Sequence, residues 1–317
     1  MRQDLAFRLY CTGKVAVAMA MLRLAERTDL DLDSSVGEIL EGIQWPEVQQ
    51  VTWRRVLTHR AGLHKPLASD VVTLDRRRRS LLVRRVGPMR GFASPRIADY
   101  SEYSGWHLLG ECLEAVSGVP LREVLHDEVL SPLGMVGTWY SMTEQEHARN
   151  ADSLGVLYDL SGGRPVPMLS DRSFTLCREW NPAYGGYGTA ESLARMLVGI
   201  LAALPGYSGG LLEPPVARSL ASDSPGPRFD RTTKQMREFT HGALKVGSQG
   251  GFGTRCSDQA FGLAGLYGTS LCVADPAYGI AIAMILNGVV HAREVAAARR
   301  EALVDAVYED LRGPQEG

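Results

Sequence analysis

Two residues near the start of the chain have types and a spacing that suit covalent catalysis. Cys11 and Lys14 stand three positions apart and lead into the apolar run from Val15 to Leu22. Residues i and i+3 share one face of a helix, so the thiol and the amine can meet there. A thiol in a first helical turn beside a cation is favoured as the thiolate, which is the activated nucleophile. The alternative is a small buried cysteine next to a lysine whose amine reaches solvent.

The composition sets limits on the class of protein. A chain of 317 residues suits about two domains or one large one. Apolar residues make up 45% and charged residues 22%, which excludes collagen-like, mucin-like and wholly disordered chains. The formal net charge of -2 gives no field that would attract nucleic acid. The apolar run is far shorter than the roughly 20 residues that span a bilayer. We therefore expect no nucleic-acid partner and no membrane span.

The cysteines favour a reducing compartment. Five of them are scattered through the chain at positions 11, 112, 177, 256 and 272, and no two form a CxxC pair. An odd number without such pairs argues against a disulfide scaffold and against a structural zinc site. The segment from Met1 to Leu5 also lacks a charged-then-apolar secretory pattern. These features predict a cytoplasmic protein with no metal and no cofactor.

The periodicity of apolar residues predicts a helix-rich middle and a strand-rich end. Helices are expected at 11–26, 34–40, 51–59, 104–116, 121–129 and 191–204. Three strands are expected at 259–263, 269–274 and 279–286, joined by tight turns into an antiparallel meander. An amphipathic helix at 293–311 should cover one face of that sheet. The arginine-rich stretch 76–96 is interpreted as a solvated loop or helix face rather than an anion site.

Several blocks of sequence occur in an order that one family shares. Residues 7–14 read FRLYCTGK, similar to F-R-x-x-S-x-x-K, and residues 51–63 are similar to a block containing LLTHTSGL. Residues 100–111 resemble YSN…LLGE, residues 184–190 resemble GGLxST, and residues 261–287 resemble a final FGHxG…N hairpin. Together they cover nearly the whole chain. The chain thus resembles the serine β-lactamase and penicillin-binding-protein-like hydrolases, in the class C β-lactamase and esterase branch.

The resemblance implies a β-lactamase-like fold of the α/β (α+β) class. Such a fold has an antiparallel sheet with flanking helices and an inserted helical domain. Residues 11–205 would form the mainly helical region that includes the nucleophile helix, while residues 1–10 and 206–317 would form the sheet and the C-terminal helix. Family members usually carry a helix and two strands before the nucleophile, but only ten residues precede Cys11. With those strands missing, we expect about three strands and an open edge, which a homodimer would cover.

The resemblance also implies roles for the first residues named above. Cys11 replaces the family's nucleophilic serine, and Lys14 would accept or steer its proton. A tyrosine should protonate the leaving group. Tyr100 is favoured for this role although it lies one residue upstream of the family position, and Tyr103 is the competitor.

Other positions depart from the family pattern in ways that bear on the substrate. Glu102 replaces the asparagine that holds a substrate amide, and Tyr103 beside it is also expected near the substrate. Leu263, Ala264 and Gly265 replace the K-[ST]-G or H-x-G motif, so the cation that grips a substrate carboxylate is absent. This argues against penicillins and D-Ala-D-Ala peptides. The backbone amides of Cys11 and Leu266 would form the oxyanion hole.

These features predict an acyltransferase or hydrolase with a cysteine nucleophile. It would act on an ester, thioester or amide through a covalent acyl-enzyme and pass the acyl group to an amine, an alcohol or water. A thioester suits aminolysis, so transfer is favoured over β-lactamase activity. The arginine-skewed composition is typical of GC-rich genomes, in which such transferases serve specialised metabolism. The alternatives are an inactive binding protein of the same fold and a serine-type esterase whose nucleophile was changed to cysteine.

Overall fold

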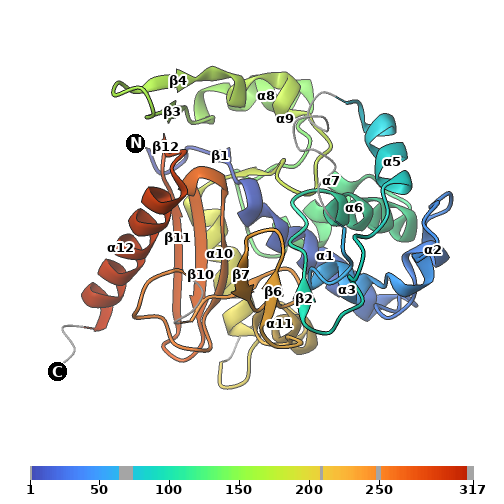
Figure 1. The fold of residues 1–317 in the computed structure, drawn as a ribbon. Helices are drawn as coiled ribbons and strands as arrows, with labels where there is room; N and C mark the ends of the chain where they lie inside the picture. Colours follow the sequence, from blue (N-terminus) through green and yellow to red (C-terminus); the bar gives the residue numbers. More distant parts are fainter. Residues whose placement is uncertain (1, 64–73, 208–209, 248–250, 313–317) are drawn as a thin grey trace.

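An antiparallel sheet of four strands forms the centre of the strand-rich part (Figure 1). The computed structural model describes residues 2–63, 74–207, 210–247 and 251–312. The strand order is β11-β10-β9-β8, with β8 at Leu244–Lys245, β9 at Phe261–Ala264, β10 at Ser270–Asp275 and β11 at Ile280–Ile285. The turn between β10 and β11 is closed by the Asp275 carboxylate, which accepts the Ala277 N–H, and by Gly279 at φ 65°. Glycine adopts this left-handed conformation without the strain that a Cβ would bring.

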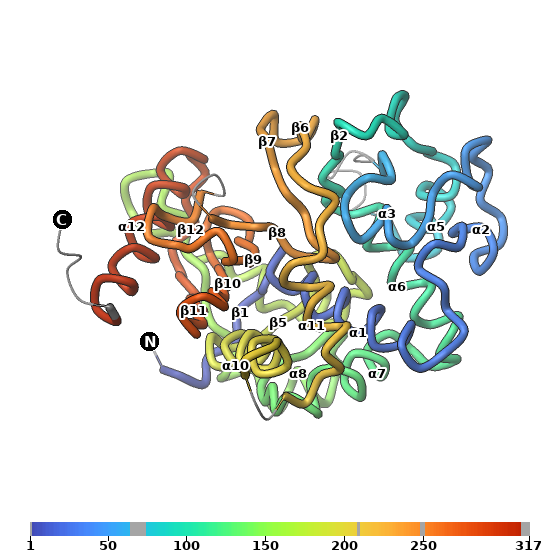
Figure 2. Tube along the Cα trace, turned by 90° about the horizontal axis from the view of Figure 1, so that it is seen from below, coloured from blue at the N-terminus to red at the C-terminus, as the bar shows by residue number. Residues whose placement is uncertain are grey.

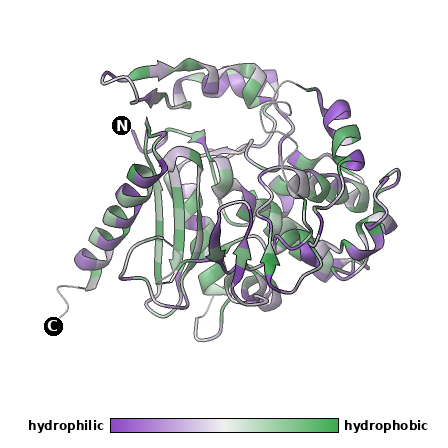
Figure 3. Ribbon diagram, in the orientation of Figure 1, coloured by the Kyte–Doolittle hydropathy of each residue, from purple (hydrophilic) through white to green (hydrophobic). Residues whose placement is uncertain are grey.

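Helices cover both faces of this sheet. Helix α10 (Ala190–Ala202) packs against β10 and β11, and Figures 1 and 2 show α12 (Arg293–Arg312) on the opposite face. In Figure 3, α12 alternates hydrophilic and hydrophobic residues, as an amphipathic helix on a sheet requires. The Tyr308 hydroxyl donates to the Asp275 carboxylate over 2.7 Å and ties α12 to the end of β10. The prediction that this helix covers the sheet is confirmed.

The helical part is built around α1 (Lys14–Arg27). Its residues from Lys14 to Leu24 are all buried, because α6 (Ser104–Ser117), α7 (Leu121–Leu125), the π-helical turn η3 (His126–Leu130) and α11 (Pro214–Ala221) pack around it. Four alanines within α1 let these neighbours approach closely. Helix α6 ends at Gly118, whose φ of 75° gives the left-handed C-cap that the sequence predicts.

Shorter elements join these two parts. The short helices are α2 (Val36–Ile39), α3 (Trp53–Leu57), α5 (Arg76–Arg85), α8 (Glu144–Asn150) and α9 (Phe174–Cys177). The 3₁₀ turns are η1 (Tyr10–Gly13), η2 (Val48–Gln50), η4 (Ala151–Ser153), η5 (Leu169–Arg172) and η6 (Leu266–Gly268). The small sheets pair β1 (Phe7–Arg8) with β5 (Tyr187–Gly188), β12 (Gly288–Val289) with β3 (Leu157–Asp159) and β4 (Val166–Met168), and β2 (Ile97–Ala98) with β6 (Arg228–Asp230) and β7 (Gln235–Arg237).

The predicted helices and the three-strand meander are present, but one expectation needs correction. The sheet has a fourth strand, β8, whose two residues are too few to show a period. Part of the arginine-rich stretch forms helix α5, a mostly solvated helix face as expected, in which Arg79 is the buried arginine and pairs with Glu179. Strand β11 pairs with β10 alone among the described strands, and a homodimer through its other edge stays a prediction. None of the described helices has the length and apolar character needed to cross a membrane.

Candidate active site

Cys11 and Lys14 meet where η1 runs into α1. Lys14 Nζ lies 3.4 Å from Cys11 Sγ and donates over 2.7 Å to the carbonyl of Ala183. Asn181 fixes that carbonyl, because its side-chain oxygen accepts the N–H groups of Ala183 and Tyr184, each over 3.1 Å. All five cysteines lie in the described part of the chain, and Cys11 is the one that is partly exposed. The thiol suited to chemistry is therefore also the accessible one.

Lys14 is 0% exposed, and its surroundings disfavour its charge. Burial lowers its pKa, while the charges of Cys11 and Glu102 act in the opposite direction. The rings of Tyr100 and Trp106 face the amine, with centroids 5.7 and 5.6 Å from Nζ. An amine with a depressed pKa beside a thiol can take the thiol's proton at neutral pH.

Tyr100 completes the cluster. Burial, together with the charge of the neighbouring Cys11, raises the pKa of Tyr100 well above its usual range. The phenol therefore keeps its proton at neutral pH and can serve as a proton donor. The Tyr100 N–H donates to the Asp230 carboxylate over 2.9 Å, which anchors the backbone at this position.

His59 holds the segment that carries Tyr100. Its carbonyl accepts the Asp99 N–H over 2.8 Å and its Nδ1 accepts the Ser101 N–H over 2.9 Å. The imidazole ring packs on Tyr100 at a centroid distance of 4.6 Å. Because His59 is buried and already accepts a hydrogen bond through Nδ1, its role here is to position the tyrosine.

His59 makes the fold sensitive to acid. Burial lowers the pKa of His59 to about 3 from 6.5, and the charge of Lys14 acts in the same direction. Below pH 6.5 His59 is therefore protonated in the unfolded chain but not in the folded chain. The free energy of unfolding falls as the pH drops towards 3. Within this range the titration of His59 lowers the free energy of unfolding by about 1.4 kcal/mol for each pH unit.

The variant His59→Asn should flatten this dependence. Asparagine offers an acceptor at the position of Nδ1, does not titrate, and tolerates the left-handed φ of 53° found here. Urea unfolding of both proteins between pH 6.5 and 4.5 measures the difference in slope. Equal slopes would show that His59 is not the source of the acid sensitivity.

Tyr103 is directed elsewhere. Its hydroxyl lies 2.9 Å from His107 Nδ1, its ring is 2% exposed, and Arg79 approaches it. The structure therefore brings Tyr100, and not Tyr103, to Cys11. Glu102 lies between the two tyrosines in the chain and is half-buried, close enough to raise the pKa of Lys14.

The two predicted oxyanion donors stand at the beginnings of short helical turns. Cys11 is the second residue of η1 and Leu266 the first of η6. The first N–H groups of a helical turn have no partner within that turn, so they can donate to a substrate. The Ser270 hydroxyl, at the start of β10 shortly after η6, donates over 2.7 Å to the carbonyl of Leu9 directly before η1 and so links the two sides. A second link is the edge-to-face contact of the Tyr10 and Tyr267 rings, at 6.4 Å.

The remaining predicted residues flank the second turn. Leu263 is buried in the core at the centre of β9, Ala264 is half-buried, and Gly265 precedes η6. Leu266 is 48% exposed beside the turn. These residues bring no charged side chain to this side of the site.

Gly265 is the position where a single methyl group should damage this arrangement. A Cβ there would collide with Ser270 Oγ and approach the Leu9 carbonyl to 3.1 Å. We expect Gly265→Ala to shift η6 and lower kcat for ester turnover by about tenfold or more, with a smaller change in KM. Steady-state kinetics check this, with Gly162→Ala as the control because a Cβ at Gly162 meets no atom within 4 Å. Equal kcat values for the two variants would contradict the role of the η6 amide.

Sequence reasoning missed the group that supports the nucleophile turn. Arg8 donates to the Tyr184 carbonyl over 3.1 Å and pairs with Asp171 and Glu179, each over 3.4 Å. The Tyr10 hydroxyl donates to Asp171 over 3.1 Å, which stabilises Tyr10 at a φ of 51° directly before Cys11. Asp171 is more than 160 residues away in sequence and lies in no recognisable motif, so no local signal could have identified it.

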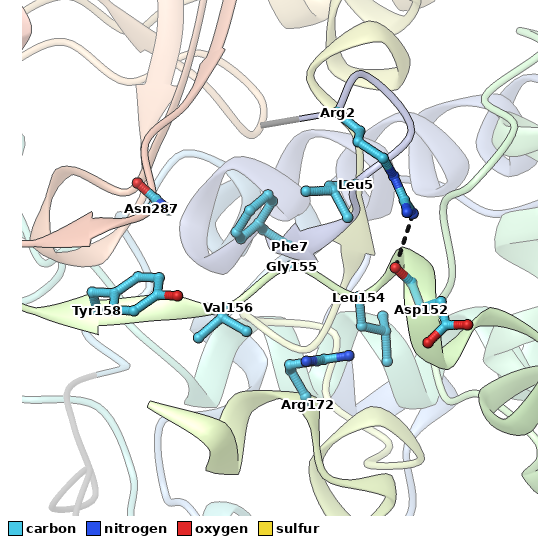
Figure 4. Close-up of a pocket in the computed structure, with 10 residues that line it drawn as sticks. All are labelled: Arg2, Leu5, Phe7, Asp152, Leu154, Gly155, Val156, Tyr158, Arg172 and Asn287. Carbon is cyan, nitrogen blue, oxygen red and sulfur yellow. Dashed lines mark hydrogen bonds between the residues drawn. The ribbon is translucent and has the colours of Figure 1, made fainter. Parts of the chain in front are cut away.

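A cavity of about 500 Å³ lies beside β1, the strand that precedes Cys11 in the chain (Figure 4). Leu5, Phe7, Leu154 and Val156 form its apolar part, and Arg2, Asp152, Tyr158, Arg172 and Asn287 form its polar part. Arg2 donates over 2.9 Å to the carbonyl of Asp152 at one end. Cys11, Lys14 and Tyr100 do not line this cavity, so it is separate from the cluster.

Within the described ranges no group of three or more His, Cys, Asp or Glu residues is arranged to hold a metal ion.

Comparison with known proteins places this chain in a family. The family model named Beta-lactamase matches residues 1–306. Esterase EstB of Burkholderia gladioli is 26% identical over 344 residues, covering 97% of this chain and 83% of the esterase. A penicillin-binding-protein homologue from Caulobacter crescentus superposes with a TM-score of 0.78 at 21% identity, covering 96% of this chain and 85% of the homologue. EstCE1, a hydrolase with promiscuous acyltransferase activity, gives 0.76 at 20% identity, covering 97% and 86%. The predicted β-lactamase-like fold is confirmed, and the chain belongs to the beta-lactamase family.

Proposed function

We propose that this enzyme transfers acyl groups through a thioester on Cys11, from an ester, thioester or amide donor to an amine, an alcohol or water. The observation that carries the proposal is the contact between the partly exposed Cys11 thiol and the fully buried Lys14 amine, with Sγ and Nζ 3.4 Å apart. Burial of Lys14 favours the neutral amine, which is the form that can accept a proton.

In the first half of the reaction, Lys14 takes the thiol proton and Cys11 Sγ attacks the carbonyl carbon of the donor. The N–H groups of Cys11 and Leu266 hold the oxygen that becomes negative; donors of this kind are typically worth about 3–4 kcal/mol each. Tyr100 then gives its proton to the leaving group as the bond to the carbonyl carbon breaks. Its raised pKa keeps that proton available.

In the second half, the acceptor replaces the leaving group beside Tyr100. The tyrosinate removes the acceptor's proton while the acceptor attacks the thioester carbonyl, and Cys11 is released as the thiolate. Lys14 returns the proton to Cys11. A thioester reacts readily with amines, so the exchange of serine for cysteine favours transfer to an amine over hydrolysis.

The side chains around the site favour neutral acyl donors. Leu263, Ala264 and Gly265 supply no cation for a substrate carboxylate, and Leu266 presents an apolar side chain that is 48% exposed. A carboxylate substrate would also meet the nearby Glu102. The esterase and the hydrolase with acyltransferase activity among the relatives support the same reaction class. All five cysteines are unpaired, which supports a reducing compartment for the enzyme.

The direct test is acylation of the protein itself. Incubation with p-nitrophenyl acetate or a small acyl thioester, followed by intact-mass measurement, should give one acyl adduct that neutral hydroxylamine removes. The adduct should map to Cys11. Adding amines or alcohols during turnover then identifies the acceptor from the product. An unacylated protein whose Cys11 reacts with iodoacetamide no faster than the four buried cysteines would overturn the proposal and favour an inactive binding protein.

A further inference from the structure

The amine that activates Cys11 is itself close enough to react with an acyl group on that thiol. Nζ of Lys14 is 3.4 Å from Sγ, and the acyl carbon of a thioester is bonded directly to that sulfur. The Ala183 carbonyl, 2.7 Å away, accepts one N–H of the amine. A neutral amine has one lone pair, and a donor bond directed at Ala183 leaves that lone pair free to face the sulfur.

The surroundings of Lys14 keep the amine in place and away from water. Its side chain is 0% exposed, and the rings of Tyr100 and Trp106 flank it. Burial disfavours the ammonium form, which has no lone pair and cannot attack. An amine held at this distance acts as an intramolecular nucleophile of high effective concentration.

We propose that Lys14 is an acylation site, which takes a small acyl group from Cys11 by an intramolecular S-to-N transfer. Nζ first passes the proton that it took from Cys11 to the Tyr100 phenolate left by the first half of the reaction, or to a leaving group that departs as an anion. The neutral Nζ then attacks the thioester carbonyl carbon, the C–N bond forms and the C–S bond breaks. The proton lost from nitrogen goes to the departing thiolate. The products are an amide on Lys14 and a free Cys11 thiol, and no further reactant is needed.

This transfer follows from having cysteine at position 11. A thioester is much more susceptible to amines than an oxygen ester is, so the same lysine beside a serine ester would react far more slowly. The amide is stable, and an acylated Lys14 can no longer accept the thiol proton. Transfer to Lys14 therefore ends turnover, and an external acceptor that removes the acyl group quickly protects the enzyme.

The inference rests on the proposed acylation of Cys11, and one time course separates the two. The protein is pulsed with p-nitrophenyl acetate, freed of the donor by desalting and kept folded at neutral pH. Samples are taken over time, treated with neutral hydroxylamine before unfolding, and analysed by intact mass and peptide mapping. We expect the hydroxylamine-resistant adduct to grow until it is the major form. Over the same period Cys11 should regain its reactivity towards iodoacetamide.

Peptide mapping identifies the acceptor unambiguously, because lysine occurs at only four positions, 14, 65, 234 and 245. The resistant acyl group should be on Lys14, where it also blocks cleavage by trypsin. Lys245→Arg should leave the time course unchanged, whereas Cys11→Ser should slow the appearance of acyl-Lys14 by about tenfold or more.

Two outcomes would overturn the inference while leaving the proposed function intact. One is an adduct that hydroxylamine removes completely at every time point, and the other is a resistant adduct spread evenly over the four lysines. Absence of any adduct, even after the briefest pulse, would instead refute acylation of Cys11 itself.

Discussion

Replacing Cys11 with alanine should reduce turnover of esters and thioesters by about 10⁴-fold or more, which is the scale seen when a covalent nucleophile is removed. The substitution takes away the atom that forms the acyl-enzyme, while Lys14 and Tyr100 keep their positions. The measurement is kcat/KM for p-nitrophenyl butyrate and for a small acyl thioester. The melting temperature should stay close to that of the parent, because Cys11 is partly exposed.

Two further variants sharpen this result. Cys177→Ala removes a fully buried thiol from a different part of the core and should keep activity. Cys11→Ser should be less active than the parent if the site is built for a thiolate. A more active serine variant would instead support a serine-type esterase whose nucleophile was changed. Retained activity in Cys11→Ala would show that the thiol is not the nucleophile.

Tyr100→Phe should slow the reaction by about 10²–10⁴-fold with poor leaving groups, the usual range for one general acid. The phenol of Tyr100 lies beside Cys11 and keeps its proton because its pKa is raised. An alkyl alkoxide or an amine leaves only with a proton, whereas p-nitrophenolate leaves without one. The loss should therefore be large for alkyl esters and small for p-nitrophenyl esters, as paired measurements of kcat/KM will reveal.

Tyr103→Phe is the matched control for this experiment. The Tyr103 hydroxyl bonds to His107 and faces Arg79, so its removal should cost some stability but leave the leaving-group dependence unchanged. If Tyr103→Phe produced the selective loss and Tyr100→Phe did not, the assignment of the proton donor would be reversed. An equal loss for all leaving groups in Tyr100→Phe would point to a structural role.

Local patterns predicted the elements that carry the chemistry. The apolar run after Lys14 and the spacing of Cys11 and Lys14 predicted the buried helix and the meeting of the two side chains. The alternation from Thr269 to Leu286 predicted the hairpin of β10 and β11. Each of these features depends on residues that are neighbours in sequence, where period and propensity act directly.

What could not be predicted depends on distant partners. The choice between Tyr100 and Tyr103 was open, because a slip of one residue in a short loop changes which ring faces Cys11. It is decided by contacts to His59 and Asp230, far away in the chain. The pairing of Arg8 with Asp171 spans a similar separation. Tertiary contacts of this kind carry no periodic signal.

The central place of α1 determines which parts of this enzyme can change in sequence and structure without unfolding the protein. Because α1 is covered on all sides, opening the backbone around Lys14 requires unfolding most of the helical part. Amide hydrogens of α1 should therefore exchange with solvent only through near-global unfolding, and much more slowly than those of η6. New substrate preferences are then expected to arise by changes in the loops around Glu102 and Leu266. Lys14 is the first residue of α1 and Cys11 lies in the turn directly before it, so the base is fixed by the most stable helix and the nucleophile is anchored next to it.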